Sequence, residues 1–297
     1  MALDDLESKL NDLALDHEAR ARIGQQLDEM GDTRPGVGLR PDGLPDIVWC
    51  AVDVARELRG VKQPFKNERG EIYGEYALQP FYIAQYPVTY AQFEAFIDAP
   101  DGWADARWWD DMTPQYGRQA IFPQRTRLDN HPREAVSWYQ AVAFGRWLNA
   151  KCMGENVSPS SASLIGHDLE IRLPLEWEWQ WAAQGVDACA YPWGDDWDGR
   201  FANTREARLG MTTAVGMYPR AASWCGALDM SGGLWEWCLN EYKMPDQVSY
   251  DRYVSRVLRG GSFVDVADWA VCGSRFNDLP NRRLDYYGFR VVYVPQP

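Results

Sequence analysis

The sequence "GGSFVDVADWAVCGSRFNDLPNRRLDYYGFRVV", residues 260–292, interleaves two kinds of residue. Glycine, proline and arginine punctuate it at Gly260, Gly261, Arg275, Pro280 and Arg290. The residues between them share no chemistry, and apolar and polar types alternate for only three positions, too few for a strand with one buried face. Glycine allows tight backbone turns, and arginine can tether loops through forked hydrogen bonds. We therefore expect a rigid frame that carries an irregular surface.

The composition places this segment in a loop-rich globular chain. The 297 residues are 46% hydrophobic and include 15 Trp, 25 Gly and 18 Pro, which favours a core tied together by large aromatic anchors. A net charge of −13 argues against nucleic-acid partners, because a polyanion would be repelled. We expect no membrane contact, because no apolar run is long enough to cross a bilayer. The six scattered cysteines and the acidic N-terminus predict a cytoplasmic protein with reduced thiols.

The N-terminal residues differ from the rest of the chain. Leucines recur at three- and four-residue intervals from Leu3 to Leu13, and Ile23 and Leu27 continue the pattern in a second short helix. The Gly- and Pro-rich residues 31–46 then form a linker. We predict a helical appendage and linker over residues 1–46, followed by one domain over residues 47–297. The helices either dock on that domain or form a homo-oligomer seam.

Within the domain, short strands are followed by helices. Residues 81–89 favour a strand, after which Thr89 can cap a helix beginning at Tyr90. Ser137 can cap a second helix, and a strand beginning at Ile171 precedes a helix that ends at Gly185. Trp-, Gly- and Tyr-rich loops fill the remainder. The expected class is α+β.

Metal chemistry has little support in the residue pattern. The histidines His17, His131 and His167 stand in separate segments without ligand spacing, so no His-based zinc or iron site is expected. The acidic loop "WGDDWDGRFANT", residues 193–204, offers oxygen ligands suited to Ca²⁺, among them Asn203. The alternative is a solvated acidic turn.

Eight motifs in order resemble one known family. They are "PVTYAQFEAFI", "HPREAVSWYQAVAFGRWL", "IRLPLEWEWQWAA", "YPWGDDWDGRFANT", "TTAVGMYP", "GALDMSGGLWEW", "VLRGGSF" and "GFRVV", spanning roughly residues 76–295. Together they resemble the formylglycine-generating-enzyme-like (sulfatase-modifying-factor) domain. The resemblance implies a variant C-type lectin fold, with the short helical appendage added.

The resemblance also bears on activity. Oxidase members of the family hold copper with two cysteines shortly after GGS-[aromatic], and the matching stretch here, "VDVADWAV", has none. Cys272 is a lone thiol outside that pair. Iron-dependent members use a histidine set and a helical partner domain that we do not find here. We therefore predict that the chain is not an enzyme and needs no cofactor. In the family's calcium motif Gly233 replaces the usual Asn, which leaves Asn203 as the candidate calcium ligand.

A non-enzymatic branch resembles the chain more closely: the variable proteins of bacterial and phage diversity-generating retroelements. In that branch GGS-[aromatic] opens, and GFRV closes, a C-terminal segment that a reverse transcriptase rewrites. The resemblance implies a ligand-binding protein with a variable region at residues 260–292 and an unknown macromolecular partner, expected to be a protein. The alternatives are a formylglycine-generating or related copper or iron oxidoreductase, and an ordinary surface. The implied contact residues are Val264, Asp265, Val266, Asp268, Trp269, Phe276, Asn277, Asp278, Leu279, Arg282, Leu284, Asp285 and Tyr286, with Tyr287 expected on the same exposed face.

Overall fold

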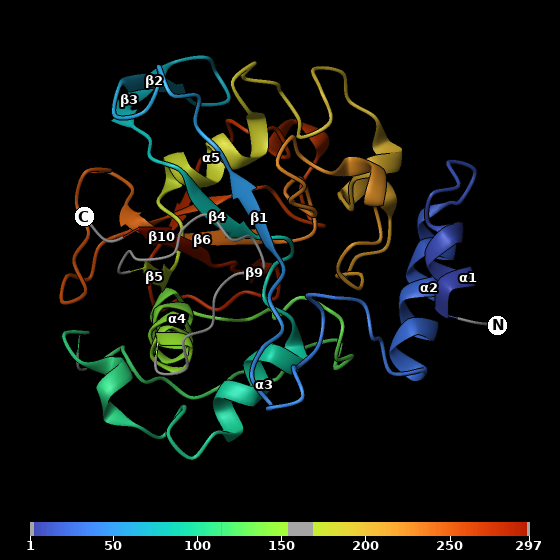
Figure 1. Ribbon diagram of the computed structural model, residues 1–297, viewed down its shortest axis with the longest axis horizontal. Helices are drawn as coiled ribbons and strands as arrows, with labels where there is room; N and C mark the ends of the chain where they lie inside the picture. Colours follow the sequence, from blue (N-terminus) through green and yellow to red (C-terminus); the bar gives the residue numbers. More distant parts are fainter. Residues whose placement is uncertain (1–2, 114, 154–168, 296–297) are drawn as a thin grey trace.

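The computed structural model describes residues 3–113, 115–153 and 169–295 (Figure 1). Short strands and helices are joined by long loops. The helices are α1 (Leu3–Lys9), α2 (His17–Glu29), α3 (Tyr90–Asp98), α4 (Trp138–Met153) and α5 (Glu176–Gln184). The strands are β1 (Trp49–Val52), β2 (Lys62–Lys66), β3 (Ile72–Ala77), β4 (Phe81–Ala84), β5 (Leu169–Arg172), β6 (Trp235–Glu241), β7 (Arg256–Arg259), β8 (Phe276–Asp278), β9 (Tyr287–Gly288) and β10 (Val292–Pro295).

These strands form separate sheets. One has the order β1-β4-β10-β5 and is antiparallel throughout. A second has the order β8-β7-β6-β9, in which β9 runs parallel to β6. Strands β2 and β3 pair as a hairpin, which lies beside α5 in Figure 1. The C-terminal segment, residues 260–292, therefore begins after one sheet and ends in the other. The predicted α+β class is confirmed.

Local sequence signals set the helix boundaries. The Thr89 hydroxyl accepts the backbone N–H of Gln92, and the Gln92 side chain accepts that of Thr89, which completes a capping box for α3. Ser137 caps α4 in the same way, accepting the N–H of Gln140. Helix α5 ends at Gly185, whose φ of +68° suits glycine. The predicted caps and this helix end are confirmed.

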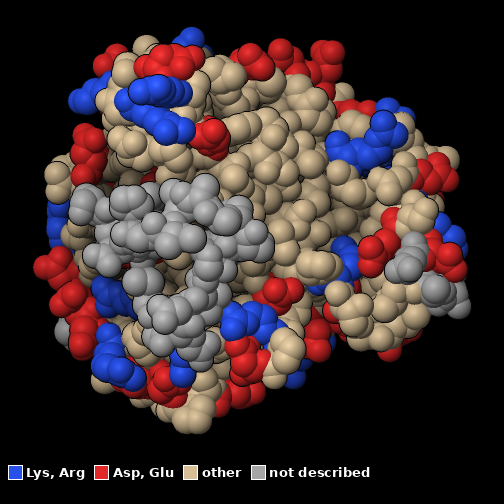
Figure 2. Space-filling model, viewed as in Figure 1, with Lys and Arg blue, Asp and Glu red and all other residues tan. Residues whose placement is uncertain are grey.

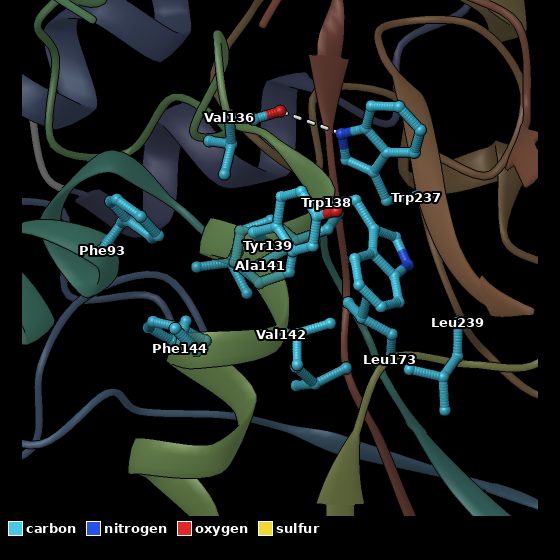
Figure 3. Close-up of a cluster of buried hydrophobic side chains, with 14 of the residues drawn as sticks. Phe93, Val136, Trp138, Tyr139, Ala141, Val142, Phe144, Leu173, Trp237 and Leu239 are labelled. Carbon is cyan, nitrogen blue, oxygen red and sulfur yellow. Dashed lines mark hydrogen bonds between the residues drawn. The ribbon is translucent and has the colours of Figure 1, made fainter. Parts of the chain in front are cut away.

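Aromatic side chains fill the main core. Phe93 of α3, Phe144 of α4 and Trp237 of β6 are almost fully buried in one cluster (Figure 3). The Trp237 indole donates to the Val136 carbonyl at 2.9 Å, so its polar atom is satisfied inside the core. The high tryptophan content thus supplies the anchors that the loops need.

The N-terminal helices pack against their own chain. Leu6, Leu10 and Leu27 are buried in a cluster with Met217 and Tyr218 of the main domain. Arg20 of α2 donates to the carbonyls of Leu10, Asp12 and Met217. The apolar stripe of the appendage is therefore covered within the chain.

Two buried glutamates bind the arginines of the C-terminal segment and of β7. Glu176, in the first turn of α5, accepts from Arg275 at 2.6 and 2.8 Å and from Arg259 of β7 at 3.1 Å. Glu236 of β6 accepts from Arg290 at 2.6 and 2.8 Å. The side chains in these pairs are at most 9% exposed. Charge-assisted forked bonds of this kind fix the orientation of the backbone that carries them.

The surface carries the excess of acid. In the face shown in Figure 2, charged side chains lie mostly around the rim, and a broad central area has none. In the described part of the chain we find no helix of sufficient length and apolarity to cross a membrane.

We predict that Glu176→Gln strongly destabilises the protein. The substitution keeps the shape of the side chain but leaves Arg259 and Arg275 without a counter-ion in a buried site, which costs about 3–5 kcal/mol. Urea unfolding, monitored by circular dichroism, measures the loss in unfolding free energy. Glu170→Gln, on a side chain that is 41% exposed, is the matched control and should change the unfolding free energy by less than about 0.5 kcal/mol. Equal effects of the two substitutions would contradict the role of the buried network.

Candidate functional site: the surface of the C-terminal segment

The C-terminal segment leaves β7 through two glycines. Gly260 and Gly261 have φ values of +100° and +72°, which favour glycine over any residue with a side chain. A Cβ on Gly261 would also lie 2.7 Å from the Trp269 carbonyl oxygen. The chain then forms a 3₁₀ turn at Ala267–Trp269, returns along β7 as β8, and crosses to β6 as β9.

The predicted frame residues are held in the interior. Gly260, Gly261, Pro280 and Arg290 are buried, and the Arg275 side chain is 9% exposed. The Pro280 carbonyl accepts the backbone N–H of Trp138 at 3.0 Å, which ties the segment to the start of α4. Arg290 also donates to the carbonyls of Ala84, Gln85 and Leu228.

The predicted contact residues all keep solvent exposure. Val264, Trp269 and Phe276 are 39%, 38% and 36% exposed, which is high for large apolar side chains. The other exposed members are Asp268, Arg282 and Asp285. The partly exposed members are Asp265, Val266, Asn277, Asp278, Leu279, Leu284 and Tyr286.

Tyr287 departs from the expectation. The sequence pattern predicted an exposed side chain here, but Tyr287 is 1% exposed and packs edge-to-face against Trp237 at 5.2 Å between ring centroids. Its backbone pairs with Trp235 in the parallel β6–β9 ladder, which turns its side chain inward. The cause is a strand pairing that residues 284–288 alone do not specify.

Two of the predicted contact residues also form hydrogen bonds to side chains of the fold itself. Asp265 accepts the Trp235 indole N–H at 2.8 Å and the Ser262 hydroxyl. Asp278 accepts the Tyr287 hydroxyl at 3.0 Å. These carboxylates hold buried groups in place, so their positions are less free to vary than the remainder of the surface.

An aromatic cluster forms the centre of this surface. It consists of Trp235, Trp269 and Phe276, with ring centroids 5.3 to 6.5 Å apart. Trp235 comes from β6 and is 2% exposed, so it supports the two exposed rings from below. Reasoning from the sequence noted its WEW motif but missed this supporting role. Its place at the start of an apolar strand was the available signal.

A loop over residues 205–211 borders the segment, and reasoning from the sequence did not predict this contact. The Arg205 backbone N–H donates to the Asp265 carbonyl at 2.8 Å, and the Ala267 N–H donates to the Glu206 carboxylate at 3.3 Å. Met211, at the end of this loop, is 36% exposed. The surface is therefore wider than residues 260–292.

Negative charge gathers beside the aromatic cluster. Partial burial is the main cause that raises the pKa of Tyr286. The nearby carboxylates of Asp265, Asp285 and Asp278 raise this pKa further. Arg282 lies 3.4 Å from Asp278, and Arg125 lies 3.8 Å from Asp285, so part of this charge is balanced. The local environment favours a partner with apolar groups and hydrogen-bond donors.

The predicted calcium ligand lies at a small buried cavity. Asn203 is 3% exposed, its Oδ1 has no hydrogen-bond partner, and its Nδ2 donates to the Met211 carbonyl. The cavity has a volume of about 20 Å³, room for one ion or water, and Asp229 also lines it. The acidic loop does not contribute in the expected way, because Asp195 accepts the Ala190 N–H and Asp198 pairs with Arg200. Asn203 thus offers one oxygen, and calcium binding stays a prediction.

The described residues contain no assembled ligand set for another metal. There we find no group of three or more His, Cys, Asp or Glu side chains arranged to hold a metal. His17 and His131 contact Tyr218 and Thr212, and burial lowers the pKa of His131 to about 4. His167 lies outside the described residues. Among the cysteines, Cys50, Cys238 and Cys272 are buried.

Comparison with known proteins gives consistent matches. Residues 60–294 match the family model described as the sulfatase-modifying factor enzyme 1-like domain. The hercynine oxygenase of Mycolicibacterium thermoresistibile is 31% identical, over 72% of this chain and 50% of its own length. The formylglycine-generating enzyme of Thermomonospora curvata is 26% identical, over 73% of this chain and 83% of its own. The chain spans about half the length of the hercynine oxygenases it matches.

A solved structure agrees with the fold. Treponema denticola variable protein 1 superposes with a TM-score of 0.57 at 21% identity, covering 83% of this chain and 95% of that protein. Together with the family match, this likeness confirms the predicted formylglycine-generating-enzyme type of C-type lectin-like fold.

The relatives correct one prediction. From the sequence we predicted that the chain is not an enzyme, and the hercynine oxygenase and formylglycine-generating enzyme matches contradict it, since both are named enzymes. That prediction rested on missing copper and iron ligands. The lack of the expected ligands does not decide whether the chain is an enzyme.

We predict that Asp229→Asn stabilises the protein at alkaline pH. Desolvation beside the small cavity raises the pKa of Asp229 to about 6, so the carboxyl favours folding below its unfolded pKa of 3.8, and that stability is lost as pH rises through about 6. Asparagine cannot ionise, can still accept the Gly216 N–H, and tolerates the φ of +57° found here. We expect a gain of about 1–2 kcal/mol at pH 8, allowing for residual solvent contact.

Urea unfolding at pH 4 and pH 8 measures this difference. The gain should largely disappear at pH 4, where the folded protein keeps Asp229 protonated and therefore as neutral as asparagine. A gain of the same size at both pH values would show that ionisation of Asp229 is not its cause. Asp187→Asn, on an exposed residue, is the control.

Proposed function

Because the chain belongs to the sulfatase-modifying factor enzyme 1-like family, we propose that it uses this fold to present the surface of the C-terminal segment to a macromolecular ligand. One observation carries the proposal: the Gly, Pro and Arg frame residues of the segment are buried, whereas the predicted contact residues between them are exposed or partly exposed. A surface of this kind can change without disturbing the core.

The chemistry of the surface favours a protein as the ligand. Exposed aromatic side chains, here Trp269 and Phe276, are enriched at the centre of protein–protein interfaces. They are supported by a buried tryptophan, so little conformational entropy is lost when they bind. The net charge of −13 disfavours nucleic acid.

We further propose that a retroelement diversifies this segment. The arrangement of frame and exposed contents supports this, and a solved protein of the same fold is named a variable protein. The test lies in the neighbouring DNA. The proposal expects a near-copy of the codons for residues 260–292, differing at adenines and adjacent to a reverse-transcriptase gene. Its absence from the complete genome would overturn diversification while leaving ligand binding open.

A second candidate function is catalysis of the kind named for the relatives. The observation in its favour is 31% identity to a hercynine oxygenase. Oxygen consumption by the purified, metal-loaded protein in the presence of hercynine tests it, and conversion of a cysteine-containing peptide to formylglycine tests the other named activity. Turnover in either assay would establish an enzyme.

We predict that substitutions separate free from structural positions on this surface. Asp265→Ala should lower the unfolding free energy by about 1–3 kcal/mol, because it leaves the buried Trp235 indole N–H without its partner. Asp268→Ala, three residues away on an exposed side chain, should change it by less than about 0.5 kcal/mol. Thermal and urea unfolding provide the measurement. A large loss from Asp268→Ala would contradict a surface that tolerates variation.

A further inference from the structure

A loop over residues 115–128 lies against the end of the C-terminal segment. Arg283 donates through Nη1 to the Ala120 carbonyl of this loop. The same guanidinium lies over the Phe122 ring, with Cζ 3.6 Å from the ring centroid. The surface of the C-terminal segment therefore continues onto a second part of the chain, which the sequence pattern did not include.

The charge of this loop is opposite to that of the whole chain. Residues 115–128 contain Arg118, Arg125 and Arg127 but no Asp or Glu, in a chain of net charge −13. All three arginines are exposed. The negative charge beside the aromatic cluster thus has a basic neighbour. A ligand that covers both regions has to complement each of them, which fixes its orientation.

Arg283 is the cation at this contact that lacks a counter-ion. Arg282 and Arg125 each pair with an aspartate. Among the described residues, no carboxylate pairs with Arg283, and partial burial lowers its pKa. Its Nε is buried without a hydrogen-bond partner, whereas its Nη2 is neither buried nor bonded to the described residues. A guanidinium that has lost water and gained no carboxylate favours an anion at its open Nη2 group.

Exposed aromatic rings lie beside this open group. Phe122 and Tyr253 are both among the exposed large side chains of the protein. The Tyr253 hydroxyl donates to Asn281 Oδ1 at 2.7 Å, and its ring stacks on Tyr116 with centroids 4.4 Å apart. These rings are held in place before any ligand arrives, and they offer apolar contact next to a positive charge.

We propose that Arg283 and Phe122 bind a protein segment that carries an Asp or Glu side chain next to an apolar one. The inference rests on the proposed function and extends its surface to the loop over residues 115–128. The ligand carboxylate accepts from Nη2 of Arg283, and the apolar side chain packs against the exposed part of Phe122. A phosphate group suits this position less well, because its second negative charge would face Asp278 and Asp285.

Selection of a phage-displayed library of random peptides on the immobilised full chain tests the chemistry of the ligand. We expect the enriched peptides to carry Asp or Glu next to an aromatic or aliphatic residue. Enrichment of peptides without an acidic residue would overturn the inference. If Trp269→Ala abolished the binding of those peptides, the proposed function would still stand. A selection in which no peptide is enriched would contradict both.

A double-mutant cycle locates the contact. Arg283→Met should lower the affinity of a synthetic acidic peptide about tenfold, measured by fluorescence anisotropy. Changing the glutamate of the peptide to glutamine should lower the affinity for the unchanged protein similarly, and should have little further effect on the Arg283→Met variant. Independent effects of the two changes would show that the carboxylate binds elsewhere and would overturn the assignment.

Two further variants control for charge and for folding. Arg69→Met removes the same charge from a side chain that is 75% exposed, between β2 and β3, and should leave the affinity unchanged. Arg283→Gln replaces Arg283→Met if the latter does not fold, because its amide can still donate to the Ala120 carbonyl. An equal loss of affinity in Arg69→Met would show that the peptide responds to net charge and not to Arg283.

Discussion

The pairing of buried glutamate with buried arginine is the constraint on which the C-terminal part of the fold depends. Glu176 holds Arg259 and Arg275, and Glu236 holds Arg290, all with little or no solvent contact. Each pair carries a desolvation cost, which the hydrogen bonds between the guanidinium and carboxylate groups offset. The pairs therefore admit a single arrangement of β7, of the residues before β8 and of the strand into β10. The loops between these points inherit fixed ends.

Because the ends of each loop in the C-terminal segment are fixed, the loop can carry side chains of unrelated chemistry next to a stable core. The side chains of Val264, Asp268 and Trp269 lie outward from a loop whose ends are set by Gly261 and by Arg275. Replacing Val264 or Asp268 changes the surface without leaving a buried cavity or an unpaired charge. Asp265 is different, because its carboxylate satisfies a buried indole. Exposure alone therefore does not decide which position can vary.

Local signals in the sequence predicted the helices well. Thr89 with Gln92, Ser137, and Gly185 each act within a few residues, so their effect can be recognised without the fold. The Gly, Pro and Arg frame positions of the C-terminal segment could be recognised in the sequence for the same reason. The inward turn of Tyr287 and the support of Trp269 by Trp235 arise from β6, which is distant from both in the sequence. Pairings over that distance depend on the whole sheet, and a pattern within one segment does not encode them.

The same separation bears on how one fold carries different activities. The contacts that specify the fold are the buried arginine–glutamate pairs and the aromatic core around Trp138 and Trp237, and neither reaches the outer surface. Chemistry on the surface depends instead on loop residues that contribute little to folding. Loop residues on the surface can therefore change while the family fold is kept. Membership of a family that includes enzymes is consistent with a binding surface here, because fold and activity rest on different residues.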